Sequence, residues 1–127
     1  ARAPASQLAV YTTVATWCDA CTRDLPAIRR LRDAFTADEV ALYGAPLDPD
    51  DSEERLRRYS ADHGPAYELL AELPQAQRKE LEQHVETTTG ALPTSIITTR
   101  DGRILATHVG APSISEVRRW LEEPALR

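Results

Sequence analysis

The only two cysteines of the chain, Cys18 and Cys21, stand where a strand pattern gives way to a helix pattern. The run before them, residues 8–15 (LAVYTTVA), is rich in the β-branched and aromatic side chains that favour a buried strand. After them, apolar residues recur at steps of three and four as far as Phe35, which is the spacing of one helix face. Pro26 lies inside this pattern, and we expect it to kink the helix by removing a backbone donor.

A cysteine at the start of a helix is well placed for thiol chemistry. Unpaired N–H groups and the positive end of the helix dipole meet there, so the thiolate of Cys18 is stabilised, and the thiolate is the species that attacks disulfides. Cys21 lies one turn further along, shielded by the helix but close enough to displace a substrate from a mixed disulfide with Cys18. The pattern therefore predicts two-step thiol–disulfide exchange between this pair and a substrate.

Other roles for the cysteine pair have less support. Zinc sites use four ligands, and the sequence has neither a second cysteine pair nor a His-x-x-x-His tract. A structural disulfide across two intervening residues would remove little loop entropy, and two inert core cysteines are the remaining alternative. One such pair cannot link distant parts of a chain, which excludes a disulfide-framework protein. We predict a site without a metal ion or another cofactor.

The rest of the chain alternates between strand and helix patterns. Strands are expected at residues 40–47, 94–99 and 104–109, and helices at 52–63, at 74–88 and after 113, with residues 66–73 ambiguous between a short strand and a helical turn. Strands separated by helices pair in parallel, and the closing Asp-Gly hairpin adds antiparallel strands. We therefore predict one α/β domain over residues 1–127, with a mixed central sheet flanked by helices on both faces and residues 1–7 as a loose lead-in.

Capping signals mark the starts of two of these helices. Asp51 with Glu54 is expected to cap the helix at 52–63, and Ser113 with Glu116 forms a capping box before the last helix. In that last helix Trp120 is expected to be a core anchor. In the helix at 74–88, Leu81 and Val85 are expected to face inward, and residues 48–58 to form a solvated loop and helix face.

Charge and hydropathy narrow the choice of partners. The net charge is −5, and the 15 cationic residues alternate with acids instead of forming the basic stripe that nucleic acid requires. The longest apolar runs fall short of the roughly 18 residues of a membrane span. The chain opens without a charged-then-apolar leader. We expect a monomeric piece of a longer or membrane-anchored protein, with no nucleic acid partner and a membrane link only through a missing anchor.

Two blocks of the sequence resemble a known family. Residues 15–21 (ATWCDAC), with Pro26 five residues after the second cysteine, resemble the active-site helix of thioredoxin-fold proteins. They are most similar to the TlpA/ResA-like branch of bacterial extracytoplasmic thiol–disulfide oxidoreductases. Residues 90–104 (GALPTSIITTRDGRI) resemble that family's G-x-P-T and D-G-R-I motifs. The resemblance covers roughly residues 8–44 and 88–122.

The resemblance implies a thioredoxin-like fold, protein thiols or disulfides as substrates, an unknown redox partner and a location outside the cytoplasm. It implies that Pro93 is cis and faces the cysteine pair, where the backbone of Leu92 can pair with a substrate strand. Trp17, Asp19 and Ala20 would complete the substrate-binding surface. For Trp17, substrate contact through partial exposure and simple burial are equally open.

The sequence departs from thioredoxins proper at three positions, the first of which it shares with a number of the extracytoplasmic members. Thr12 occupies the place where thioredoxins proper carry a buried aspartate that assists proton transfer. Asp19 and Ala20 replace the common Gly-Pro between the cysteines, and a carboxylate beside Cys18 opposes formation of its thiolate. Our hypothesis is a less acidic nucleophile than in strong oxidants of the DsbA type, and so a reductant or a slow exchanger.

Residues 47–59 look somewhat like the Sco copper chaperones, which share the fold and use a Cys-x-x-x-Cys pair plus a distal histidine. This chain has one residue fewer between its cysteines, and His63, His84 and His108 match no such motif. Each of them is expected to be a surface or partly packed imidazole. Copper delivery, or a non-catalytic interaction module on the same fold, is the alternative function.

Overall fold

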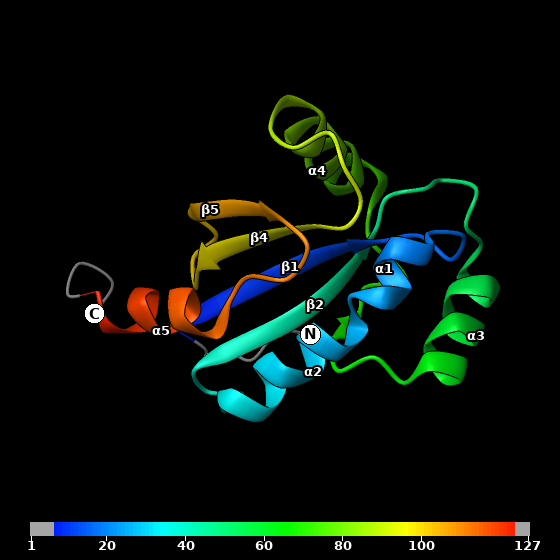
Figure 1. The fold of residues 1–127 in the computed structure, drawn as a ribbon. Coiled ribbons are helices and arrows are strands. Elements are labelled where there is room, and N and C mark those ends of the chain that lie inside the picture. Colours follow the sequence, from blue (N-terminus) through cyan, green and yellow to red (C-terminus); the bar gives the residue numbers. More distant parts are fainter. Residues whose placement is uncertain (1–6, 124–127) are drawn as a thin grey trace.

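The strand before the cysteines forms the centre of the sheet in this computed structural model, which describes residues 7–123. The strands lie in the order β3-β2-β1-β4-β5 (Figure 1). Their bounds are β1 Leu8–Val14, β2 Val40–Pro46, β3 Glu68–Leu69, β4 Thr94–Thr99 and β5 Ile104–Val109. The pairs β1–β2 and β2–β3 are parallel, whereas β1–β4 and β4–β5 are antiparallel. The predicted mixed sheet is confirmed, and the ambiguous segment 66–73 contributes the short edge strand β3.

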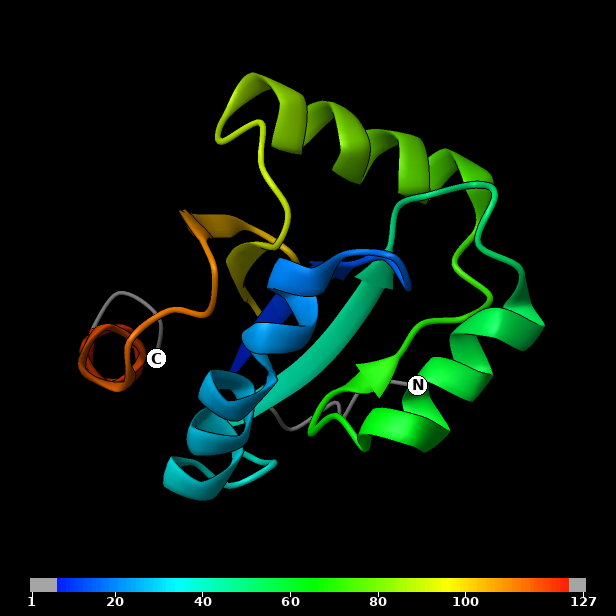
Figure 2. The ribbon, with the colours of Figure 1, turned by 45° about the vertical axis from the view of Figure 1, so that its right-hand side comes forward.

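Helices cover both faces of this sheet. Their bounds are α1 Asp19–Arg23, α2 Leu25–Ala34, α3 Glu53–His63, α4 Gln75–Thr87 and α5 Ile114–Glu122. Ile28 of α2 and Val117 of α5 pack in one core cluster with Ile97 of β4. Side chains alternate along a strand, so Ile96 points to the other face, where it lines a cavity of about 480 Å³ together with Leu81 of α4. Figure 2 shows α1 and α2 in front of the sheet, α5 and α3 to either side and α4 across the top.

The single kinked helix expected after the cysteines is in fact two helices. Asp24 ends α1 and precedes α2, and its backbone N–H still bonds the carbonyls of Ala20 and Cys21. Pro26 falls in the first turn of α2, where a backbone N–H would have no intrahelical acceptor in any case. Pro26 therefore removes no hydrogen bond, and the correction is that it starts a helix instead of kinking one.

The caps agree with the sequence at one helix and differ at another. Ser113 caps α5 as predicted, accepting the Glu116 backbone N–H at 3.1 Å. At α3 the cap is Ser52, whose Oγ accepts the Arg55 N–H at 3.1 Å, so the expected capping by Asp51 is wrong. Ser52 has the extended backbone of an N-cap, and the Asp51 carboxylate is engaged elsewhere.

Two of the predicted inward-facing residues are only partly buried. In α4, Val85 is buried and Leu81 is half-buried beside the cavity. In α5, Trp120 packs half-buried against the main core cluster, and its Nε1 donates to Glu116 Oε2 at 3.4 Å. Both helices therefore keep the predicted face toward the sheet.

Candidate active site

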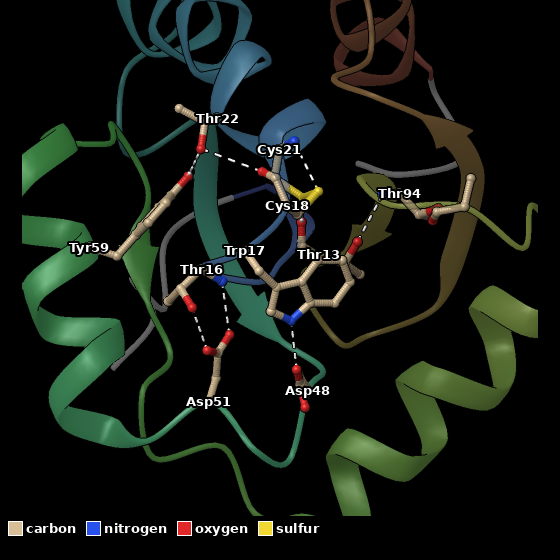
Figure 3. The surroundings of a disulfide bond; sticks show 11 residues. Thr13, Thr16, Trp17, Cys18, Cys21, Thr22, Asp48, Asp51, Tyr59 and Thr94 are labelled. Carbon is tan, nitrogen blue, oxygen red and sulfur yellow. Dashed lines mark hydrogen bonds between the residues drawn. A yellow bond between two sulfur atoms is a disulfide. The ribbon is translucent and has the colours of Figure 1, made fainter.

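Cys18 and Cys21 form a disulfide at the start of α1, with their Cα atoms 5.3 Å apart (Figure 3). Cys18 is the N-cap of this helix, and its Sγ accepts the Cys21 backbone N–H at 3.1 Å. A sulfur in the N-cap position replaces the oxygen that normally accepts such an N–H group. A thiolate at Cys18 would be a stronger acceptor for this N–H than the bonded sulfur is.

The two sulfurs have different polar neighbours. Cys21 Sγ lies 3.8 Å from the backbone carbonyl oxygen of Thr13, a group that can only accept a hydrogen bond. A reduced Cys21 can therefore donate its S–H to that carbonyl, which favours the neutral thiol. Cys18 is 7% exposed and Cys21 4% exposed, so only a small opening leads to the pair.

Trp17 is exposed beside Cys18, so simple burial is wrong and substrate contact stays a prediction. Its side chain is 58% exposed, and its indole Nε1–H donates to Asp48 Oδ2 at 2.6 Å. The Asp50 backbone N–H and, second, the Trp17 indole lower the pKa of Asp48, because both donate to the ionised carboxylate. The loop after β2 therefore fixes the orientation of an exposed aromatic ring next to Cys18.

Asp51 supports the backbone just before the cysteines. Its buried carboxylate accepts the Thr16 backbone N–H at 2.8 Å and also the Thr16 hydroxyl (Figure 3). Arg55 adds an ion pair at 3.7 Å. The expectation that residues 48–58 are only a solvated loop and helix face is therefore wrong at the buried Asp51, whereas the hydrogen bond between Asp48 and Trp17 is exposed. No local sequence signal marks these contacts, because they join residues more than thirty positions apart.

The remaining residues predicted for the site lie around the disulfide. The Leu92–Pro93 peptide bond is cis, as the resemblance implies, and Pro93 is buried. Leu92 packs half-buried against the cluster of Ala15, Cys18 and Cys21, as does Ala20. Asp19 is exposed at the first position of α1.

Two groups near the cis-proline were not predicted from the sequence. The Gly110 N–H donates to the Pro93 carbonyl at 2.8 Å, which ties the end of β5 to the cis-proline. Val109, paired in register with Thr94, is 63% exposed. Among residues 7–123, no hydrogen bond involves the backbone N–H or carbonyl of Leu92. The site thus combines open backbone groups with exposed apolar side chains.

The histidines have structural contacts of their own. His63 packs its ring on Tyr59, His84 Nε2 bonds the Thr107 hydroxyl at 2.9 Å, and His108 Nε2 bonds Glu116 at 2.8 Å. Within the described range 7–123, no three His, Cys, Asp or Glu side chains gather as a metal site would require. Thr12, at the position of the thioredoxin aspartate, is buried.

A Cys-x-x-Cys disulfide at a strand–helix junction, with the residue before a cis-proline packed against it on a sheet of this strand order, defines a thioredoxin-fold protein with a candidate redox site. The particular family follows from the sequence. The family model for AhpC/TSA matches residues 4–107, so the chain belongs to the AhpC/TSA family.

Several known proteins are similar to this chain. Sporulation thiol-disulfide oxidoreductase A of Bacillus subtilis (strain 168) is 28% identical over 109 residues, which cover 84% of this chain and 62% of that protein. The chain therefore spans about three-fifths of that relative. The crystal structure of StoA from Bacillus subtilis has a TM-score of 0.66 at 19% identity, covering 90% of this chain and 81% of that one. The crystal structure of a thio-disulfide isomerase from Thermus thermophilus has a TM-score of 0.67 at 20% identity, covering 90% of this chain and 76% of that one.

Among the residues that the structure describes, no helix has both the length and the apolar character needed to cross a bilayer. The longest, α4, has 13 residues, many of them charged or amide-bearing.

Proposed function

We propose that this chain is a thiol–disulfide oxidoreductase domain that exchanges disulfides with protein thiols, using Cys18 as the nucleophile and Cys21 as the resolving thiol. The observation that carries the proposal is the contact between Cys18 Sγ and the Cys21 N–H at the N-cap of α1. This donor stabilises a thiolate at Cys18, whereas the Thr13 carbonyl favours a neutral thiol at Cys21.

In the reducing direction, the Cys18 thiolate attacks one sulfur of a substrate disulfide. A Cys18–substrate disulfide forms, and the other substrate sulfur leaves as a thiolate that takes a proton from solvent. Cys21 then loses its proton to solvent, and its thiolate attacks Cys18 Sγ and releases the second substrate sulfur. Two electrons pass from the protein dithiol to the substrate, and the structure shows the resulting Cys18–Cys21 disulfide. A dithiol partner of the same chemistry must restore the reduced form.

The proposed substrate surface surrounds the narrow opening at Cys18. The open backbone groups of Leu92, beside the buried Pro93, suit an extended peptide, which can add its main-chain hydrogen bonds there. The exposed indole of Trp17 and the exposed methyl groups of Val109 offer apolar contact. Asp19 and Ala20 would contact the substrate next to the cysteine itself.

We further propose that the domain acts as a reductant outside the cytoplasm. Asp19 supports the first part, because an exposed carboxylate next to Cys18 opposes its thiolate, and a reductant needs a less stabilised dithiol form. The similarity of residues 15–21 and 90–104 to extracytoplasmic oxidoreductases supports the second part.

The test is the reduction potential of the Cys18–Cys21 pair, measured by equilibrating the protein against glutathione and dithiothreitol buffers. Cys18→Ser is the control that cannot form the disulfide. We expect a value near that of thioredoxin, roughly −270 mV. A value near −120 mV, typical of DsbA, would refute the reductant assignment and the role of Asp19. Failure of the wild-type protein to form the disulfide would refute the oxidoreductase proposal altogether.

A further inference from the structure

Thr13 is the one described residue that contacts both a cysteine and the cis-proline segment through different polar groups. It lies near the end of β1 and is only 1% exposed. Its backbone carbonyl is 3.8 Å from Cys21 Sγ. Its hydroxyl accepts the Thr94 backbone N–H at 2.8 Å, a contact between residues 81 positions apart (Figure 3).

The Thr13–Thr94 contact replaces a ladder hydrogen bond. The β1–β4 pairing ends at Thr12 opposite Ser95, so the same register brings Thr13 opposite Thr94. Thr94 directly follows Pro93, which has no N–H, so its N–H is the first backbone donor after the cis bond. This buried donor depends on the Thr13 side chain, and without that hydroxyl it would be left unsatisfied.

The Thr94 side chain also forms hydrogen bonds with the loop that precedes the cis bond. Its hydroxyl donates to the Ala91 carbonyl at 2.6 Å and also contacts the Thr89 hydroxyl. Thr94 therefore lies on one side of Leu92 and Pro93 and is bonded to Ala91 on the other side, so it holds both ends of this short segment. That residue in turn is held to β1 by Thr13.

We propose that Thr13 is a positioning residue, which holds the Leu92–Pro93 segment in register with the Cys18–Cys21 pair for docking of a polypeptide substrate. The proposal rests on the proposed oxidoreductase function. A protein disulfide has to align its backbone on Leu92, so its reaction depends on the place of this segment. The reaction of a small disulfide, which reaches Cys18 without backbone pairing, does not depend on the position of this segment.

The test compares Thr13→Val with Thr13→Ser. Valine keeps the β-branched shape but removes the acceptor, whereas serine keeps the hydroxyl. The matched control is Thr98→Val, because Thr98 is a buried β4 threonine whose hydroxyl donates only to the adjacent Thr99 carbonyl. The register places it opposite Ala9, toward the other end of β1 from Thr13.

Each reduced variant is mixed with insulin, a disulfide-bonded polypeptide, and separately with hydroxyethyl disulfide, and second-order rate constants are measured in single turnovers. We expect Thr13→Val to lower the insulin rate constant about tenfold, equal to about 1.4 kcal/mol, because one hydrogen bond is lost. Its rate constant with hydroxyethyl disulfide should stay within about twofold of wild type. Thr13→Ser should restore the insulin rate, and Thr98→Val should leave both rates near wild type. Equal losses with both disulfides, or none with either, would overturn the positioning role.

A second measurement separates this proposal from the proposed function. Hydrogen exchange of the Thr94 amide, measured on the oxidised protein, needs no activity. We expect Thr13→Val to accelerate exchange at Thr94 at least tenfold, while core amides of β1 and β2 stay protected. If wild-type protein fails to reduce insulin but the exchange result holds, the reductant proposal fails and the anchoring by Thr13 stands. Unchanged exchange at Thr94 would refute the anchoring itself.

Discussion

Replacing Asp51 tests how strongly the loop after β2 supports the cysteine segment. The Asp51 carboxylate is buried and accepts both the backbone N–H and the hydroxyl of Thr16. Asp51→Ala removes both hydrogen bonds together with the ion pair to Arg55. Asp51→Asn keeps the shape and one acceptor oxygen, but its amide nitrogen cannot accept the second donor.

The expected loss follows from the number and type of these contacts. A hydrogen bond to a charged group contributes about 1.5–3 kcal/mol, so two of them at Asp51 set an upper limit of about 3–6 kcal/mol. Two effects reduce this value. Removing the carboxylate also removes the cost of burying it, and Thr16 is only half-buried, so water can reach its freed N–H. We therefore expect the free energy of unfolding to fall by about 3 kcal/mol in Asp51→Ala and about 1–2 kcal/mol in Asp51→Asn.

The measurement is urea unfolding of the oxidised proteins at neutral pH. With a slope of about 2 kcal/mol per molar urea, a loss of 3 kcal/mol moves the midpoint by about 1.5 M. Asp50→Asn is the matched control, because Asp50 is an exposed neighbour on the same loop, and its effect should stay within about 0.5 kcal/mol. An Asp51→Asn protein as stable as this control would refute the view that the carboxylate holds the cysteine segment.

Three further predictions concern packing, pH and the thiol. A methyl group at Gly44 would overlap the ring of Tyr67, so Gly44→Ala should cost about 1–3 kcal/mol in urea unfolding, and much less in a Tyr67→Ala background. Burial raises the pKa of Asp24 despite opposing effects of the Ala111 N–H and Arg30, so wild type loses stability as pH rises through that pKa. Asp24→Asn should therefore lose less stability than wild type as pH rises through that pKa, and urea midpoints that shift equally would contradict this. Asp19→Asn should lower the pKa of the reduced Cys18 thiol, measured by ultraviolet absorbance of the thiolate. An unchanged pKa would refute the view that the Asp19 carboxylate opposes the Cys18 thiolate.

The features that the sequence predicted correctly depend on local patterns. The strand before Cys18, the hairpin at residues 100–103 and the cap at Ser113 each follow from side chains within a few positions of one another. The break at Asp24 was missed although its signal is local. Pro26 fits both a kink inside a long helix and the first turn of a new one, and periodicity alone does not separate the two.

The support of the site could not be predicted, because it depends on pairs far apart in the chain. Asp51 and Thr16 are 35 positions apart, and Thr13 and Thr94 are 81 apart. An aspartate in a charged, loop-like run has the composition of a solvated segment, and a threonine in a strand fits any buried position. Only the pairing of strands and the return of the loop after β2 give these residues their partners.

The polar contacts divide the site into two parts with different charge. On the outer side, Asp48 and Asp51 use their carboxylates to hold Trp17 and Thr16, so negative charge is satisfied by N–H and hydroxyl donors of the segment before the cysteine. On the inner side, neutral groups of Thr13 contact Cys21 and hold the cis-proline segment. The Cys21 N–H at the helix start donates to Cys18 Sγ, whereas Cys21 Sγ contacts the Thr13 carbonyl, which can only accept a hydrogen bond. The difference between two sulfurs that are both buried therefore comes from the hydrogen-bonding groups on each side, more than from their exposure to solvent.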